Sequence, residues 1–93
     1  DKLQQLISAL NVNTVGAFLS ALKMLNQFLD VNPTITISLQ QFYGLFDQLD
    51  QTFQRLPESF GQGLSQRQII ASMIAVNRQV NQLYGFLIGR QIV

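Results

Sequence analysis

Residues 38–56 read SLQQFYGLFDQLDQTFQRL, and this stretch decides the fold. Its apolar side chains recur at alternating steps of three and four residues, which places them along one stripe of an α-helix. Ser38 and Gln41 have the spacing of a capping box, which begins the helix. Pro57 is expected to end it, because a proline disfavours helical backbone in the residue before it. The predicted buried stripe consists of Leu39, Phe42, Phe46, Leu49, Phe53 and Leu56.

Such a stripe needs partners, and three further segments have the periodicity of amphipathic helices. They span residues 2–10, 14–30 and 66–88, and the last two begin at predicted N-caps, Thr14 and Ser65. The last segment carries two neighbouring apolar stripes, so we expect it to touch more than one neighbour. The predicted core positions are Leu3, Leu6, Ile7 and Leu10; Val15, Phe18, Leu22, Leu25 and Leu29, with Leu19 and Met24 beside them; and Ile69, Met73, Val76, Val80, Leu83 and Leu87, with Ile70, Ile74, Tyr84 and Ile88 as the second stripe.

Two stretches interrupt the helices. Residues 31–37, VNPTITI, contain a proline and alternating β-branched residues, which favour extended backbone. We interpret them as a connector that lays Ile35 or Ile37 over the end of the core; the alternative is an edge that pairs with another copy. Residues 57–64, PESFGQGL, form a turn in which Phe60 and Leu64 are expected to plug the open end of the bundle.

The fold class predicted from these elements is all-α. Residues 1–93 suit a single small domain, a four-helix bundle that is mostly antiparallel because its connections are short. The first helix is short, and the alternative is that it docks on another copy, so that dimerisation completes the bundle. Residues 31–37 would then be the hinge of an intertwined dimer.

The composition argues against several kinds of chemistry. The chain has no cysteine and no histidine, so thiolate nucleophiles and the commonest proton shuttle and metal ligand are missing. Asp47 and Asp50 lie one turn apart on the predicted exposed side of their helix, where a solvated polar face is the expected role. Charged residues make up 12% of the chain and the net charge is +1, too little for nucleic-acid binding. We therefore expect no enzyme activity, no cofactor, no metal, no nucleic-acid partner and no membrane span.

Candidate interface residues are those whose positions the predicted core stripes do not fully explain. Asn77 and Asn81 interrupt the second stripe of the last helix, where polar residues either fix an oligomer's register or are simply exposed to solvent. Phe28, Tyr43 and Phe86 lie off the main stripes and would form an interface patch if they were exposed together. The six candidates are Phe28, Tyr43, Asn77, Asn81, Tyr84 and Phe86.

These observations favour a non-catalytic helical module that associates with itself. Scattered glutamines replace charged residues on the polar faces, so copies repel one another little. In composition the chain is loosely similar to helical domains of extracellular fibre proteins and to helical coat proteins of filamentous archaeal viruses, which implies an extracellular or particle-associated location. Two alternatives stay open: a carrier of an apolar ligand such as a lipid, and an adaptor that binds a helix of a different protein.

Overall fold

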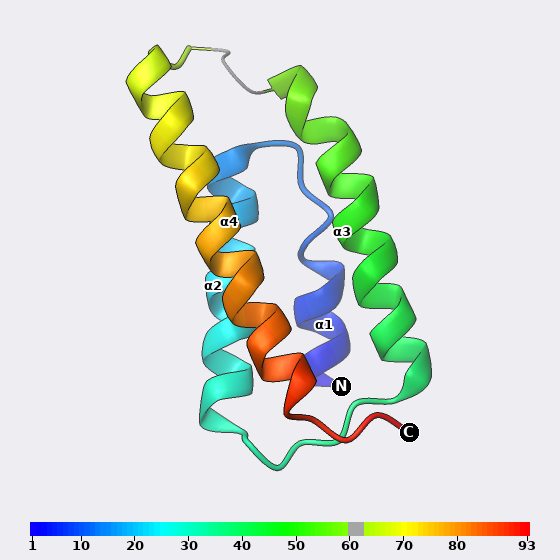
Figure 1. The fold of residues 1–93 in the computed structure, drawn as a ribbon. Helices are drawn as coiled ribbons and strands as arrows, with labels where there is room; N and C mark the ends of the chain where they lie inside the picture. Colours follow the sequence, from blue (N-terminus) through cyan, green and yellow to red (C-terminus); the bar gives the residue numbers. More distant parts are fainter. Residues whose placement is uncertain (60–62) are drawn as a thin grey trace.

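The computed structural model describes residues 1–59 and 63–93, and in this part of the chain the regular elements are four helices that alternate in direction (Figure 1). They are α1 (Lys2–Ser8), α2 (Val15–Val31), α3 (Leu39–Ser59) and α4 (Gln66–Ile88). Consecutive helices are antiparallel, which confirms the predicted all-α, four-helix architecture. None of the described helices is long and apolar enough to cross a membrane.

Side-chain caps begin the helices where the sequence indicates. The Thr14 hydroxyl accepts a hydrogen bond from the amide of Ala17. Both predicted capping boxes are present: Ser38 and Gln41 bond each other's backbone amides at 3.1 Å in both directions, and Ser65 and Gln68 do the same. Each box satisfies two backbone donors that the first turn of a helix leaves unpaired.

The core lies where α2 meets α4 and where α1 wedges between α2 and α3. The predicted stripes of α1 and α2 are buried throughout, with Phe18 and Leu22 fully enclosed. Met24 is an exception, because it is half exposed and does not widen the buried face. The most extensive packing joins α2 and α4. These two helices run parallel because one helix, α3, separates them in a chain whose helices alternate in direction.

Helix α3 buries a face that is rotated from the predicted one. Leu45 and Thr52 are buried with Leu49 and Leu56, whereas Phe42, Phe46 and Phe53 are half-buried at the margin of the core and Leu39 is 48% exposed. The Thr52 hydroxyl, fully enclosed, donates a 2.8 Å hydrogen bond to the carbonyl of Leu10. This bond joins α3 to the segment that follows α1. Because it satisfies the Thr52 hydroxyl, this polar side chain can face the core.

Two further expectations about chain breaks need correction. Helix α3 continues past Pro57 to Ser59, because a proline biases the preceding residue away from helical backbone without excluding it. The proposed plug residue Phe60 lies outside the described residues, and Leu64 is half-buried. Gly63 in the turn before α4 has a φ of 72°, a left-handed conformation that glycine adopts without strain.

The connector between α2 and α3 buries Ile37, as predicted. It begins, however, with a turn at residues 33–34, where the amide of Ile35 donates to the carbonyl of Asn32 at 3.2 Å, and only then leads into an extended bridge at Ile37. Its partner is the end of the same chain: Ile37 forms a parallel bridge with Ile92, and the amide of Val93 donates to the carbonyl of Ile37 at 3.1 Å. The sequence pattern offered no partner for this segment. The partner is the extended segment at residues 91–93, after α4. The connector and this segment therefore cover the same end of the bundle (Figure 1).

Arg90, in the segment after α4, links this segment to the end of α2. Its guanidinium donates to the carbonyl of Asn32 at 2.6 Å and also to the carbonyl of Leu29. The last carbonyls of a helix have no partner within the helix and carry the negative end of its dipole. A cation from the C-terminal segment therefore caps α2.

Candidate functional site: an apolar groove between α3 and α4

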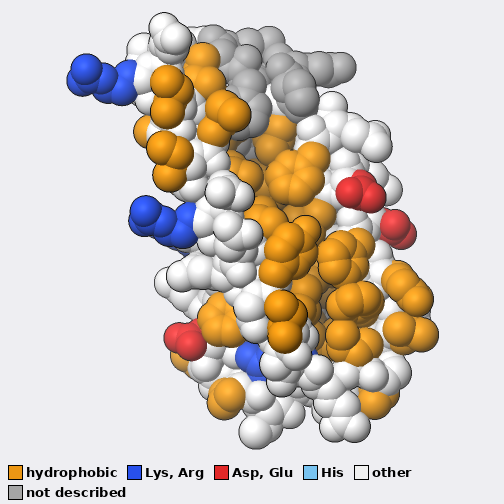
Figure 2. Space-filling view, viewed as in Figure 1, with side chains coloured by type: hydrophobic (Ala, Val, Ile, Leu, Met, Phe, Trp, Pro, Cys, Tyr) orange, Lys and Arg blue, Asp and Glu red, His pale blue; other side chains and the backbone are white. Residues whose placement is uncertain are grey.

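Helices α3 and α4 lie on the same side of the molecule without backbone contact between them in the described part of the chain. The helix behind them, α1, has seven residues, whereas α3 has 21. Helix α1 lies beside α3 between Gln41, which donates to Asp1, and Thr52, which donates to the Leu10 carbonyl. In front of it, Figure 2 shows a hollow lined by hydrophobic side chains along α3 and α4.

Four aromatic rings cross this hollow. Tyr43, Phe42 and Phe46 are neighbours on α3, with ring centroids 6.0 Å and 4.8 Å apart in edge-to-face geometry. Phe46 then stacks on Tyr84 of α4, with centroids 6.1 Å apart and ring planes 20° from parallel. Both geometries are favourable for aromatic pairs. This aromatic row is the contact that holds α3 and α4 at a fixed distance.

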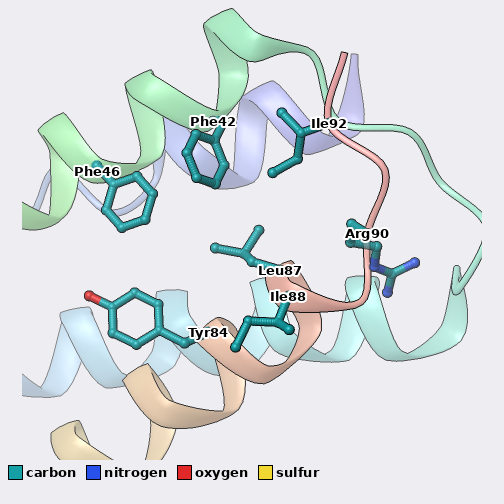
Figure 3. Close-up of a pocket in the computed structure, with 7 residues that line it drawn as sticks. All are labelled: Phe42, Phe46, Tyr84, Leu87, Ile88, Arg90 and Ile92. Atoms are coloured by element: carbon teal, nitrogen blue, oxygen red, sulfur yellow. The ribbon is translucent and has the colours of Figure 1, made fainter.

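Three of these rings, Phe42, Phe46 and Tyr84, line a groove of about 530 Å³, drawn in Figure 3. The polar groups of its lining residues' side chains are the Tyr84 hydroxyl and the Arg90 guanidinium, which points away from the groove toward the end of α2. No charged group therefore faces the groove from the residues that line it. They are Phe42, Phe46, Tyr84, Leu87, Ile88, Arg90 and Ile92.

Most of the second stripe of α4 is exposed, contrary to the expectation that it touches another helix, and Tyr84, which stacks on Phe46 of α3, is the exception. Ile70 and Ile74 are 52% and 57% exposed, and Ile88 is 86% exposed. Met73, predicted in the main stripe, is 57% exposed and belongs to this outer face as well. The stripe points away from α2 because α4 turns Val76, Val80, Leu83 and Leu87 toward the core.

The six predicted interface residues do not form one patch. Tyr43 and Tyr84 lie in the aromatic row, and Asn77 and Asn81 are exposed along the outer stripe of α4. Phe28 and Phe86 are half-buried against the core, and they border two other depressions that involve α2. Phe28, Tyr43 and Phe86 are therefore not exposed together in the single chain, and their role as interface residues stays a prediction.

A buried amide that the periodicity did not single out lies between α2 and α4. Asn26 is 5% exposed, and its Nδ2 donates to the backbone carbonyl and to Oε1 of Gln79, at 3.0 Å and 2.8 Å. Its position on the same face as Leu22 and Leu29 was the available signal. These hydrogen bonds fix the register of the parallel α2–α4 pair, since sliding either helix would break them.

The carboxylates are dispersed. Asp47 and Asp50 are both exposed, as predicted for a solvated face. Among the described residues, no three Asp or Glu side chains gather closely enough to hold a metal ion. The feature of this surface with the most distinctive chemistry is accordingly the groove with its adjoining apolar stripe.

Comparison with known proteins adds no relative: no protein-family model, curated protein or solved structure matches the chain significantly.

Proposed function

We propose that this protein is a non-catalytic helical module that associates with further copies of itself through the outer apolar face of α3 and α4. The observation that supports this most directly is the set of large apolar side chains left open on these two helices in the single chain. Monomeric proteins rarely expose a contiguous apolar surface of more than a few hundred Å². The exposed set comprises Leu39, Tyr43, Ile70, Met73, Ile74, Tyr84 and Ile88.

The polar surroundings of this face support the same proposal. They are mainly amides and hydroxyls, and the net charge of the chain is +1. Two copies therefore approach each other with little electrostatic repulsion, and their contact depends little on salt. An extracellular fibre or coat is the setting that we propose, because such assemblies are built by repeated contacts between identical copies.

The direct test is the molar mass in solution at two protein concentrations, measured by sedimentation equilibrium at about 5 µM and about 500 µM. We expect a concentration-dependent dimer or larger species. A single monomer mass at both concentrations would contradict the proposal.

A second candidate, a carrier of an apolar ligand, is supported by the size and lining of the groove. Its volume of about 530 Å³ falls in the range of small-molecule sites, and two phenylalanines and a tyrosine line it. Native mass spectrometry separates the two functions. A co-purified lipid mass on a monomer supports the carrier, whereas a dimer without added mass supports assembly.

A further inference from the structure

The exposed stripe of α4 has the spacing of a coiled-coil seam. Its positions advance by alternating steps of four and three residues, the heptad repeat that keeps side chains facing one partner helix. The six positions are exposed, and apart from Tyr84, which also stacks on Phe46 of α3, no described helix of the protomer covers them. In order they are Ile70, Ile74, Asn77, Asn81, Tyr84 and Ile88.

The order of residue types along the stripe is symmetric about Gln79. Reversing the helix about this point superimposes Ile70 on Ile88, Ile74 on Tyr84, and Asn77 on Asn81. An antiparallel pair of identical helices brings these positions to the same level. Each level then joins residues of like character, two apolar layers at either end and amides in the middle.

We propose that a second copy of this chain packs its α4 antiparallel against α4 in this register, about a two-fold axis near Gln79. The contact is isologous, so the same surface serves on both copies and this contact alone closes as a dimer; a fibre or coat would need a second contact between dimers through another face. The inference rests on the proposed function, self-association, and specifies the surface and the register that it uses.

The two asparagines disfavour shifted registers, whereas a parallel pair in register would also place asparagine against asparagine and is separated from the antiparallel pair by the cross-linking experiment below. Asn77 of one copy lies level with Asn81 of the second, and each side-chain amide has both a donor and an acceptor to offer. A shift by one heptad, or a parallel arrangement in a different register, would place an amide against isoleucine or tyrosine without a hydrogen-bond partner. A single polar layer in an apolar seam is a known way to fix register at some cost in stability.

The amount of apolar surface suits a dimer of moderate affinity. If each large apolar side chain offers about 200 Å² when fully exposed, the exposed fractions of the apolar seam positions Ile70, Ile74, Tyr84 and Ile88 leave roughly 450 Å² open on one copy, and Met73 beside the seam adds about 100 Å². A standard interface buries about 800 Å² on each partner, including its polar rim. The apolar seam therefore supplies more than half of such an interface, and the amides beside it must supply the rest.

Charges lie outside the seam. Arg67 and Arg78 are exposed along the margin of the stripe, and neither occupies one of the six seam positions. The two Arg78 side chains of a dimer lie on the same flank near the axis, where their long stems can extend the guanidinium groups into water. Salt should therefore leave the dimer unchanged or strengthen it slightly.

The register is tested by disulfide cross-linking, for which the absence of native cysteine is convenient. Ile70→Cys protein is mixed with an equal amount of isotope-labelled Ile88→Cys protein, oxidised mildly and analysed by mass. The antiparallel register predicts mixed disulfides in large excess over either homodimer, because Cys at position 70 in two antiparallel copies would be separated by about 27 Å along the helix. Excess of homodimers, or no cross-link above control, would overturn the proposal.

An exposed position outside the seam supplies the control. Asp50→Cys on α3 measures random collisional cross-linking under the same conditions. Asn77→Cys mixed with Asn81→Cys gives a second pair in the middle of the seam, and it too should form the mixed product. Circular dichroism of each variant verifies that the helices remain.

A charge in the seam provides an independent readout. Ile74→Lys should raise the dimer dissociation constant at least thirtyfold while the fold is kept, because the side chain is largely exposed in the single chain. Gln51→Lys, on the exposed side of α3, is the matched control and should leave the constant within about twofold.

The possible failures are distinguishable. A wild-type protein that stays monomeric contradicts both self-association and this seam. A wild-type dimer that resists Ile74→Lys and gives no mixed disulfide contradicts the seam alone, and self-association through another face then stands.

Discussion

Replacing Arg90 by methionine tests whether the C-terminal segment stabilises the bundle by capping α2. The change keeps most of the aliphatic stem and removes the donors to the carbonyls of Leu29 and Asn32. A hydrogen bond from a charged group contributes about 1.5–3 kcal/mol, and a cation at a helix C-terminus about 0.3–1 kcal/mol. Arg90 is only half-buried, so water replaces part of this, and we expect a net loss of about 2–3 kcal/mol in the free energy of unfolding.

That loss is large for a chain of this size. Ninety-three residues correspond to a total stability of about 5–14 kcal/mol, and a loss of 2–3 kcal/mol lowers the melting temperature by about 10–20 °C. Urea denaturation followed by circular dichroism at 222 nm measures the change. A low protein concentration keeps association from contributing to the apparent stability.

Two further variants make this prediction refutable. Arg78→Met removes an exposed arginine from the same part of the chain and should cost less than about 0.5 kcal/mol. Arg90→Lys keeps the charge but not the planar fork that reaches two carbonyls, and it should fall between the wild type and Arg90→Met. If Arg90→Met and Arg78→Met unfold at the same urea concentration, the capping argument is wrong.

Three other predictions follow from the same structure. Thr52→Val should cost about 0.5–1.5 kcal/mol by removing its hydrogen bond to the Leu10 carbonyl, which keeps its bond from the Val12 amide, while Thr52→Ser retains both; equal urea midpoints for these variants would contradict this. Phe18→Ala should cost about 3–5 kcal/mol, whereas Phe46→Ala, at the edge of the groove, should cost about 1–2 kcal/mol; an equal loss would show that Phe46 belongs to the core. Raising salt from about 0.1 M to about 1 M should not raise the dimer dissociation constant measured by sedimentation, and more than a threefold rise would indicate essential ion pairs.

Local signals in the sequence predicted the helices well. The capping boxes at Ser38 and Ser65 depend on residues three positions apart, and such pairs act the same way in any context. The stripe of α2 from Val15 to Leu29 is narrow and regular, so its buried face could be assigned without knowing its neighbours. The short stripe of α1 was equally clear.

Errors arose where a choice depended on distant parts of the chain. Helix α3 is apolar over a wide arc, and the wedge of α1 turned Leu45 and Thr52 inward at the expense of Leu39. The second stripe of α4 looked like a core face because periodicity cannot distinguish a surface buried in the chain from one left open. Tyr43 was correctly placed off the core stripes and Tyr84 was assigned to the second stripe of α4, yet the link between them through Phe42 and Phe46 depends on the spacing of two helices.

The pairing of α2 with α4 determines how long the apolar face of α2 stays exposed while the chain is synthesised. The apolar face of α2 is complete once residue 31 has been made, but its main partner follows only after α3. The cation that caps α2 comes later still, at residue 90. During synthesis the face of α2 that packs on α4 therefore stays exposed until α4 has left the exit tunnel. We expect the nascent chain to bind chaperones during this interval.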